Sequence, residues 1–235
     1  MKKTLDYGIT YGGIPNPAIK EAINQDKALH KLLKKDLTGI TAFGFTDSDW
    51  AGDKSTRRST SGYLYNLYEG AISWKSAKQP IVATSSTEAE YIACTEAAKE
   101  GLWLQRIMAE ICGETAPRTM DYSHESEIHD LIQTLDLNSN SNSLNTNYQI
   151  HKPQIIFADN QGAIKLSKNP QHHNRTKHID VKYHFVREST QRGLIYLAYI
   201  PTGEMVADIL TKSLPRDRHE KHMKSMGITG SVGNN

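Results

Sequence analysis

Three short apolar runs joined by turns constrain the fold of this chain more than any other feature. Residues 39–45 (GITAFGF) form the first run, which ends at Thr46-Asp47. Residues 63–67 form the second, and Glu69-Gly70 then turns the chain into the third, residues 71–75. Aromatic and apolar residues on both sides of a glycine turn are typical of a β-hairpin. The sequence therefore predicts three consecutive strands that are antiparallel neighbours.

A long helix and alternating strand and helix patterns follow these runs. Ser85 and Glu88 have capping-box spacing, which predicts a helix from Ser85 to about residue 111. The continuous apolar run 155–158 (IIFA) is typical of a fully buried strand. The remaining expected elements are helices at 159–167, 176–191 and 201–210 and a strand at 194–200. This order predicts an α/β fold of three layers with a mixed sheet.

The domain organisation follows from where these patterns occur. We expect residues 1–36 to be an N-terminal appendage, 37–214 a single domain, and 215–235 a C-terminal tail. Residues 113–152 lack periodicity and contain the run NSNSNS at 138–143. Such a polar segment buries too little apolar surface to offset its ordering entropy, so we expect a disordered insertion.

Composition excludes several classes of protein. The formal net charge is only +2, so a nucleic-acid surface must come from local basic patches. Two cysteines fit neither a disulfide framework nor a thiolate zinc site. Because no apolar run approaches about 18 residues, we expect no membrane partner and an intracellular location.

Two aspartates stand where open α/β sheets place their ligands, at the ends of strands. Asp47 follows the first predicted strand, and Asp159 lies between the buried strand and a helix. Each has an ordinary structural alternative, because Asp47 fits a turn and Asp159 fits a helix cap.

Glu90 and Asp208 lie in apolar surroundings. Glu90 begins a helical face of small and apolar residues that must pack on the sheet, namely Ala93, Cys94, Ala97, Gly101, Leu104 and Met108. Asp208 lies within MVADIL, although a solvent-facing position on an amphipathic helix is an equal alternative for it. Removing a carboxylate from water at the edge of the core costs free energy unless a cation compensates its charge.

Together the four acids Asp47, Glu90, Asp159 and Asp208 predict a catalytic metal site. Carboxylates without cysteine or obligatory histidine ligands favour a hard ion such as Mg²⁺ or Mn²⁺. Two such ions per site, about 3.5–4 Å apart, would clamp a phosphodiester, and no protein nucleophile is needed.

Five sequence blocks occur in a characteristic order: GFTDSDWAGD, TSSTEAEYIA, IIFADNQGAI, RTKHIDVKYHFVRE and YIPTGEMVADILTKSLP. They resemble the ribonuclease H (RNase H) domain of copia-type LTR retrotransposon Pol polyproteins over about residues 37–214. The resemblance implies an RNase H-like fold with a five-stranded sheet and cleavage of the RNA strand of an RNA–DNA hybrid. It also implies that the four acids are the catalytic residues. The upstream LDYGITY resembles the end of the connection after the reverse transcriptase, which implies that domain as a partner and a cytoplasmic virus-like particle or the nucleus as the location.

The chain departs from cellular RNases H in the loop before the last helix. Those enzymes carry a histidine in the loop before the last helix, and the sequence here is Pro201-Thr202-Gly203-Glu204. His178 is an alternative group to reach the scissile phosphate. Asp49 is a possible supporting residue beside Asp47.

Basic and polar residues near the acids are the expected nucleic-acid contacts. Phosphate contacts would give salt-dependent, largely sequence-independent affinity, and 2′-hydroxyl contacts would select the hybrid. The predicted contacts are Arg57, Arg58, Asn160, Gln161, Arg175, Lys177 and His178. The histidines at 172, 173, 178 and 184 match no zinc-finger spacing.

Two further functions remain open from the sequence. One is a metal-dependent nuclease of the same fold that acts on another nucleic acid. The other is a catalytically silent, nucleic-acid-binding retrotransposon remnant, against which the presence of all four carboxylates argues.

Overall fold

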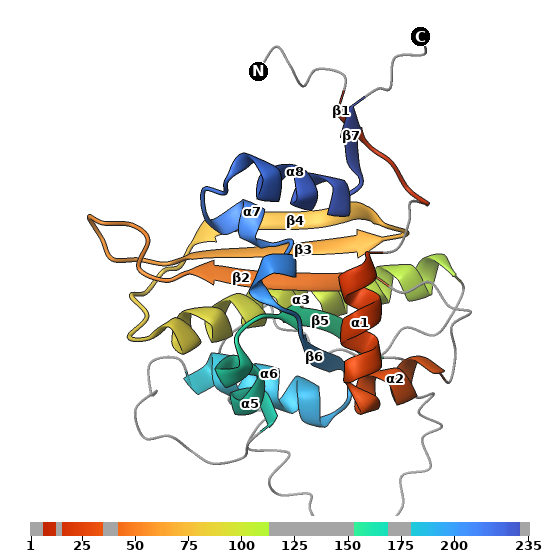
Figure 1. Cartoon of the computed structure of the whole chain (residues 1–235). Helices are drawn as coiled ribbons and strands as arrows, with labels where there is room; N and C mark the ends of the chain where they lie inside the picture. Colours follow the sequence, from red (N-terminus) through yellow and green to blue (C-terminus); the bar gives the residue numbers. More distant parts are fainter. Residues whose placement is uncertain (1–6, 13–15, 35–41, 113–152, 169–179, 231–235) are drawn as a thin grey trace, which may run out of the picture.

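A computed structural model of the chain describes residues 7–12, 16–34, 42–112, 153–168 and 180–230. Its centre is a mixed five-stranded sheet in the order β4-β3-β2-β5-β6, with helices on both faces (Figure 1). The predicted α/β fold with a five-stranded mixed sheet is thereby confirmed. Residues 113–152, where the sequence predicts a disordered insertion, lie outside the described residues.

The three predicted strands form an antiparallel meander. They are β2 (Phe43–Asp49), β3 (Thr60–Leu67) and β4 (Gly70–Lys78). Strand β2 pairs antiparallel with β3, and β3 pairs antiparallel with β4, as the hairpin signals predict. Strand β2 continues to Asp49, two residues beyond the position where the sequence predicts Asp47 as the first residue after the strand.

Two parallel strands complete the sheet. Strand β5 (Gln154–Ala158) is buried at every position and pairs parallel with both β2 and β6 (Ile195–Tyr199). This full burial explains the uninterrupted apolar run, because helices cover both faces of a parallel segment.

Helices on one face of the sheet form the first part of the core. These are α3 (Ser86–Ile111), α5 (Gln161–Lys168) and α6 (Asp180–Gln191). Their core residues include Cys94, Ala163 and Val186, which cluster with Tyr65 and Ile156 of the sheet. Helix α3 begins as predicted, because the Ser85 side chain accepts a hydrogen bond from the backbone N–H of Glu88 at 3.1 Å.

The opposite face is covered by segments from both ends of the chain. The helices α1 (Pro17–Gln25) and α2 (Lys27–Lys34) bury Ile19 and Leu29 in the same cluster as Phe45 and Phe157. Residues 16–34, part of the expected appendage, therefore contribute directly to the core. Whether residue 36 is a domain boundary stays a prediction.

The expected C-terminal tail contains regular structure. Helix α8 (Arg216–Ser225) is followed by strand β7 (Ile228–Gly230), which pairs antiparallel with β1 (Tyr7–Ile9). Met226 between them is buried in the same core cluster as α1. Both described ends of the chain therefore meet on one side of the sheet (Figure 1). No helix in the described ranges is long and apolar enough to span a bilayer.

Candidate metal centre

Asp47 and Asp159 lie side by side because of the parallel pairing of their strands. Thr46 of β2 is the register partner of Ala158 of β5, so the next residue of each chain segment is an aspartate. Asp47 is almost fully buried at 1% exposure, and Asp159 is partly buried. The carboxyl ends of neighbouring parallel strands thus bring together two acids that are far apart in the sequence.

Glu90 reaches the same place from the first turns of helix α3. Its Oε1 accepts a hydrogen bond from the backbone N–H of Ser48 at 3.2 Å. One carboxylate oxygen from each of Asp47, Glu90 and Asp159 lies within 4.8 Å of the others. Glu90 Oε2 is buried and has no hydrogen-bond partner among the described residues. Three of the four predicted catalytic acids therefore form one cluster.

The electrostatics of this cluster favour a bound cation. Burial, followed by the charges of Asp47 and Asp159, raises the pKa of Glu90 to about 9. Burial is also the largest cause that raises the pKa of Asp159. A bound divalent cation would lower the pKa of both carboxyl groups, because it stabilises their ionised form. The unpartnered Glu90 oxygen and the all-oxygen donor set fit Mg²⁺ or Mn²⁺.

The segment that carries Asp208 folds differently from the predicted helix. The expected continuous helix at 201–210 is wrong: a 3₁₀ turn, η2 (Thr202–Glu204), is separated from the short helix α7 (Asp208–Thr211). Met205 adopts an extended conformation between them. Met205, Val206 and Ala207, which join the two elements, are fully buried.

Two cations hold the Asp208 carboxylate, which is fully buried. Arg218 Nη2 donates to Asp208 Oδ2 at 2.8 Å, and Lys212 Nζ lies 3.0 Å from Asp208 Oδ1. Burial, and then the charge of Asp47, raises the pKa of Asp208 to about 6. Asp208 therefore lies close to Asp47 but outside the group of three acids that could share one ion. Its role as a metal ligand stays a prediction.

The sequence analysis missed three residues that contact these acids. The Thr211 hydroxyl donates to Asp47 Oδ2, and Lys212 Nζ lies 3.4 Å from Asp47 Oδ1. Their spacing from Asp208, three and four positions, is a helical signal within the last sequence block. Arg218 had no such signal, because it lies in the segment expected to be a tail.

Gly62 allows α7 to approach this site. It is the register partner of Asp47 on β3. A Cβ atom at Gly62 would lie 2.7 Å from Thr211 Cγ2 and 3.0 Å from Leu210 Cβ. A glycine at this position therefore lets α7 pack directly on the sheet beside Asp47.

The predicted nucleic-acid contacts are only partly described. Arg57 and Arg58 are exposed in the loop between β2 and β3, which follows the end of the strand that carries Asp47 (Figure 1). Asn160 Oδ1 accepts from the backbone N–H of Ala163 at 3.0 Å and so caps α5, whereas Gln161 is exposed. The other predicted contacts, Arg175, Lys177 and His178, lie outside the described residues.

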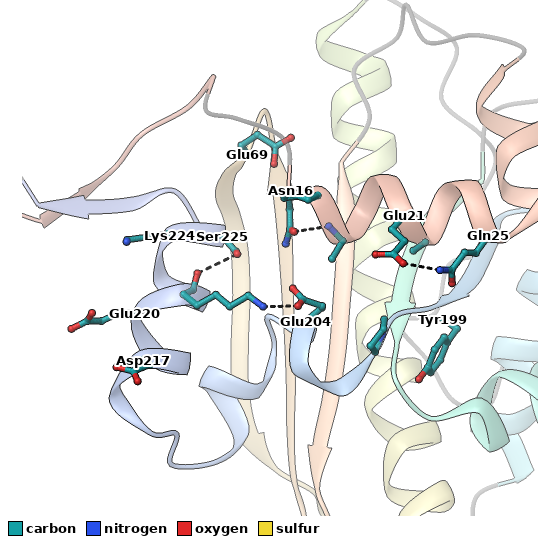
Figure 2. Close-up of a pocket in the computed structure, with 15 residues that line it drawn as sticks. Asn16, Glu21, Gln25, Glu69, Tyr199, Glu204, Asp217, Glu220, Lys224 and Ser225 are labelled. Atoms are coloured by element: carbon teal, nitrogen blue, oxygen red, sulfur yellow. Dashed lines mark hydrogen bonds and ion pairs between the residues drawn. The ribbon is translucent and has the colours of Figure 1, made fainter.

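A cavity of about 700 Å³ lies between helices α1 and α8, and its lining does not include Asp47, Glu90 or Asp159. Figure 2 shows that charged and polar groups in its wall interact with one another. Gln25 donates to Glu21 at 2.9 Å, and Lys221 binds Glu204. Some of the polar groups that line the cavity therefore already have hydrogen-bond or ion-pair partners within the protein.

Comparison with curated proteins identifies relatives over most of the chain. It is 38% identical over 185 residues to the retrovirus-related Pol polyprotein from transposon TNT 1-94 of Nicotiana tabacum, which covers 79% of this chain. It is 30% identical over 200 residues to the Pol polyprotein from transposon RE1 of Arabidopsis thaliana, which covers 85% of this chain. The chain spans only 11% of the length of each relative.

Comparison with solved structures gives weaker similarity. LC11-RNase H1 in complex with an RNA/DNA hybrid aligns with 73% of this chain and 94% of its own, at a TM-score of 0.43 and 13% identity. No protein-family model matches the chain. On the sequence similarity, the chain is a homologue of one segment of the retrovirus-related Pol polyproteins of transposons, the family that its five sequence blocks resemble.

Proposed function

We propose that this chain is a metal-dependent endonuclease that hydrolyses the RNA strand of RNA–DNA hybrids. The observation that carries the proposal is the cluster of Asp47, Glu90 and Asp159, whose carboxylate oxygens lie within 4.8 Å of one another. Support comes also from the order of the five sequence blocks and from the homology to Pol polyproteins.

Each residue of the cluster has a distinct part in this proposal. Asp47, Glu90 and Asp159 would hold a divalent ion, which when bound activates water and stabilises charge on the phosphate. The Ser48 N–H orients Glu90, and the Thr211 hydroxyl orients Asp47. These contacts keep the carboxylates in position before any ion binds, which reduces the reorganisation that binding requires.

The mechanism with two ions per site is part of this proposal. Asp208 is the fourth acid, and with Asp47 it would contribute to a second ion. Arg57 and Arg58 would contact phosphates of the hybrid, because both are exposed beside the end of β2. We propose further that the chain works beside the reverse transcriptase domain of the same polyprotein.

The direct test is cleavage by the purified full chain of an RNA–DNA hybrid labelled on either strand. Cleavage of only the RNA strand is expected with Mg²⁺ or Mn²⁺, and none is expected with EDTA. Asp47→Asn and Asp159→Asn should abolish cleavage and leave the far-UV dichroism unchanged. Asp217→Asn is the matched control, because it neutralises an exposed acid of α8.

The alternatives give different results in the same assay. A nuclease for another nucleic acid would cut duplex DNA or duplex RNA in preference to the hybrid. A silent remnant would bind the hybrid in a filter assay and leave both strands intact. Undiminished turnover by Asp159→Asn would contradict the metal assignment itself.

A further inference from the structure

Lys212 bridges two buried carboxylates from distant parts of the sequence. Its Nζ lies 3.0 Å from Asp208 Oδ1 and 3.4 Å from Asp47 Oδ1. The lysine side chain is 33% exposed, whereas the aspartate side chains are exposed by only 0% and 1%. This is therefore not an ordinary surface ion pair, because both acids have lost their access to water.

The Asp208 carboxylate already has cationic partners within the protein. Asp47 and Asp208 are two buried anions, and Lys212 and Arg218 are two cations in contact with them. On the other side of Asp47, Glu90 forms no ion pair with a basic side chain of the described residues, and its Oε2 has no hydrogen-bond partner among them. Among the described residues, Asp208 therefore has two cationic partners, whereas Glu90 has none.

We infer that the Lys212 ammonium group occupies the position between Asp47 and Asp208 that a second divalent ion would require. The nucleic-acid-free protein then takes one divalent ion, at Asp47, Glu90 and Asp159. A second ion binds only when the ammonium group moves away. This inference rests on the proposed metal-dependent function and deepens it.

The physical reason is competition for the same oxygens. Mg²⁺ and Mn²⁺ bind carboxylate oxygens directly and in a strict geometry. An ammonium group that already contacts Oδ1 of both aspartates blocks this approach and repels a second cation at short range. Lys212 follows α7 directly, so the same short helix that supplies Asp208 also supplies the group that competes for it.

A purely structural role for Lys212 predicts a different outcome. Arg218 already contacts the other Asp208 oxygen, Oδ2. If Lys212 only neutralised buried charge, its removal would lower stability and leave the number of bound ions unchanged. Counting the ions therefore separates the two roles without any measurement of cleavage.

The test is Mn²⁺ titration of the full chain by calorimetry without nucleic acid. We expect one bound ion in the parent protein and two in Lys212→Met, or a second ion bound at least about 10-fold more tightly. Lys212→Arg keeps the charge and should bind one ion. Lys221→Met is the matched control, because it removes a lysine that pairs with Glu204.

Far-UV dichroism and thermal melting establish that each variant is folded. Lys212→Gln provides a second neutral variant if Lys212→Met does not fold, and it should also bind two ions. The melting temperature of a two-ion variant should rise further with Mn²⁺ than that of the parent.

Equal ion numbers and affinities in the parent, Lys212→Met and Lys212→Gln would overturn the inference. This result is distinct from failure of the proposed function. A parent protein that binds one ion, gains a second on loss of Lys212, and never cuts a hybrid would keep the inference and remove the hybrid ribonuclease.

Discussion

The guanidinium group of Arg218 donates a hydrogen bond to Asp208 Oδ2 at 2.8 Å and so connects helix α8 to the carboxylates of the candidate site. Asp208 is fully buried, and this contact compensates part of its charge. Residues beyond 214, expected from the sequence to be a tail, therefore contribute to the electrostatics of the site.

Arg218→Met should destabilise the protein by about 2 kcal/mol, because it removes a charged hydrogen bond from a buried carboxylate. Lys212 remains and limits the loss. The midpoint of urea unfolding measures the effect. Arg216→Met is the control: Arg216 pairs with Glu220 on the surface, where solvent screening leaves an ion pair with little effect on stability. Equal effects of the two variants would contradict the role given to Arg218.

Truncation after Leu214 should abolish the cooperative thermal transition. It removes Met226 from the core, and it removes the Ser225 carbonyl that accepts from Asn66 Nδ2 at 2.6 Å. Thermal melting followed by far-UV dichroism tests this. A milder variant, Met226→Ala, should cost about 2–5 kcal/mol as a large-to-small core substitution. A truncated chain with an unchanged melting temperature would show that α8 and β7 are dispensable.

Gly62→Ala should lower both stability and Mn²⁺ affinity. The added methyl group would lie 2.7 Å from Thr211 Cγ2, so α7 must shift away from Asp47. Overpacking of this kind costs about 1–3 kcal/mol. Urea unfolding and calorimetric Mn²⁺ titration measure the two effects. Gly8→Ala is the control, since nothing lies within 4 Å of a Cβ atom there. Parent-like Mn²⁺ affinity in Gly62→Ala would show that α7 does not position the metal site.

His222 should make stability depend on pH on the acidic side. Burial, and then the positive charges of Arg218 and Lys221, lowers its pKa from 6.5 to about 4. Between these pH values the unfolded chain binds a proton that the folded chain does not, so this contribution to stability rises from pH 4 to pH 6.5.

His222→Leu should remove that dependence. At pH 5 the free energy of unfolding should improve, relative to the parent, by up to about 2 kcal/mol more than at pH 7.5. Urea unfolding of both proteins at the two pH values measures this difference. The same effect of the substitution at both values would indicate that His222 is protonated equally in the folded and unfolded chains.

The local sequence patterns predicted most of the sheet. The strand at 155–158 was recognisable because burial on both faces of a parallel strand favours an uninterrupted apolar run. The start of α3 was recognisable because Ser85 caps it through a contact only three residues away. The sequence pattern wrongly predicted one continuous helix at 201–210, where Met205 is extended between a 3₁₀ turn and the short helix α7.

The sequence by itself determined which acids are candidates, because their positions depend on strand ends and helix faces that short-range periodicity encodes. Only the tertiary structure decided which acids lie close enough to share an ion and which acid is paired with basic side chains. Asp47, Glu90 and Asp159 form one cluster, and Asp208 is held by Lys212 and Arg218. The physical reason is that buried charges are compensated by whichever groups the folded chain brings within a few ångströms, and Arg218 reaches Asp208 only because α8 packs beside α7.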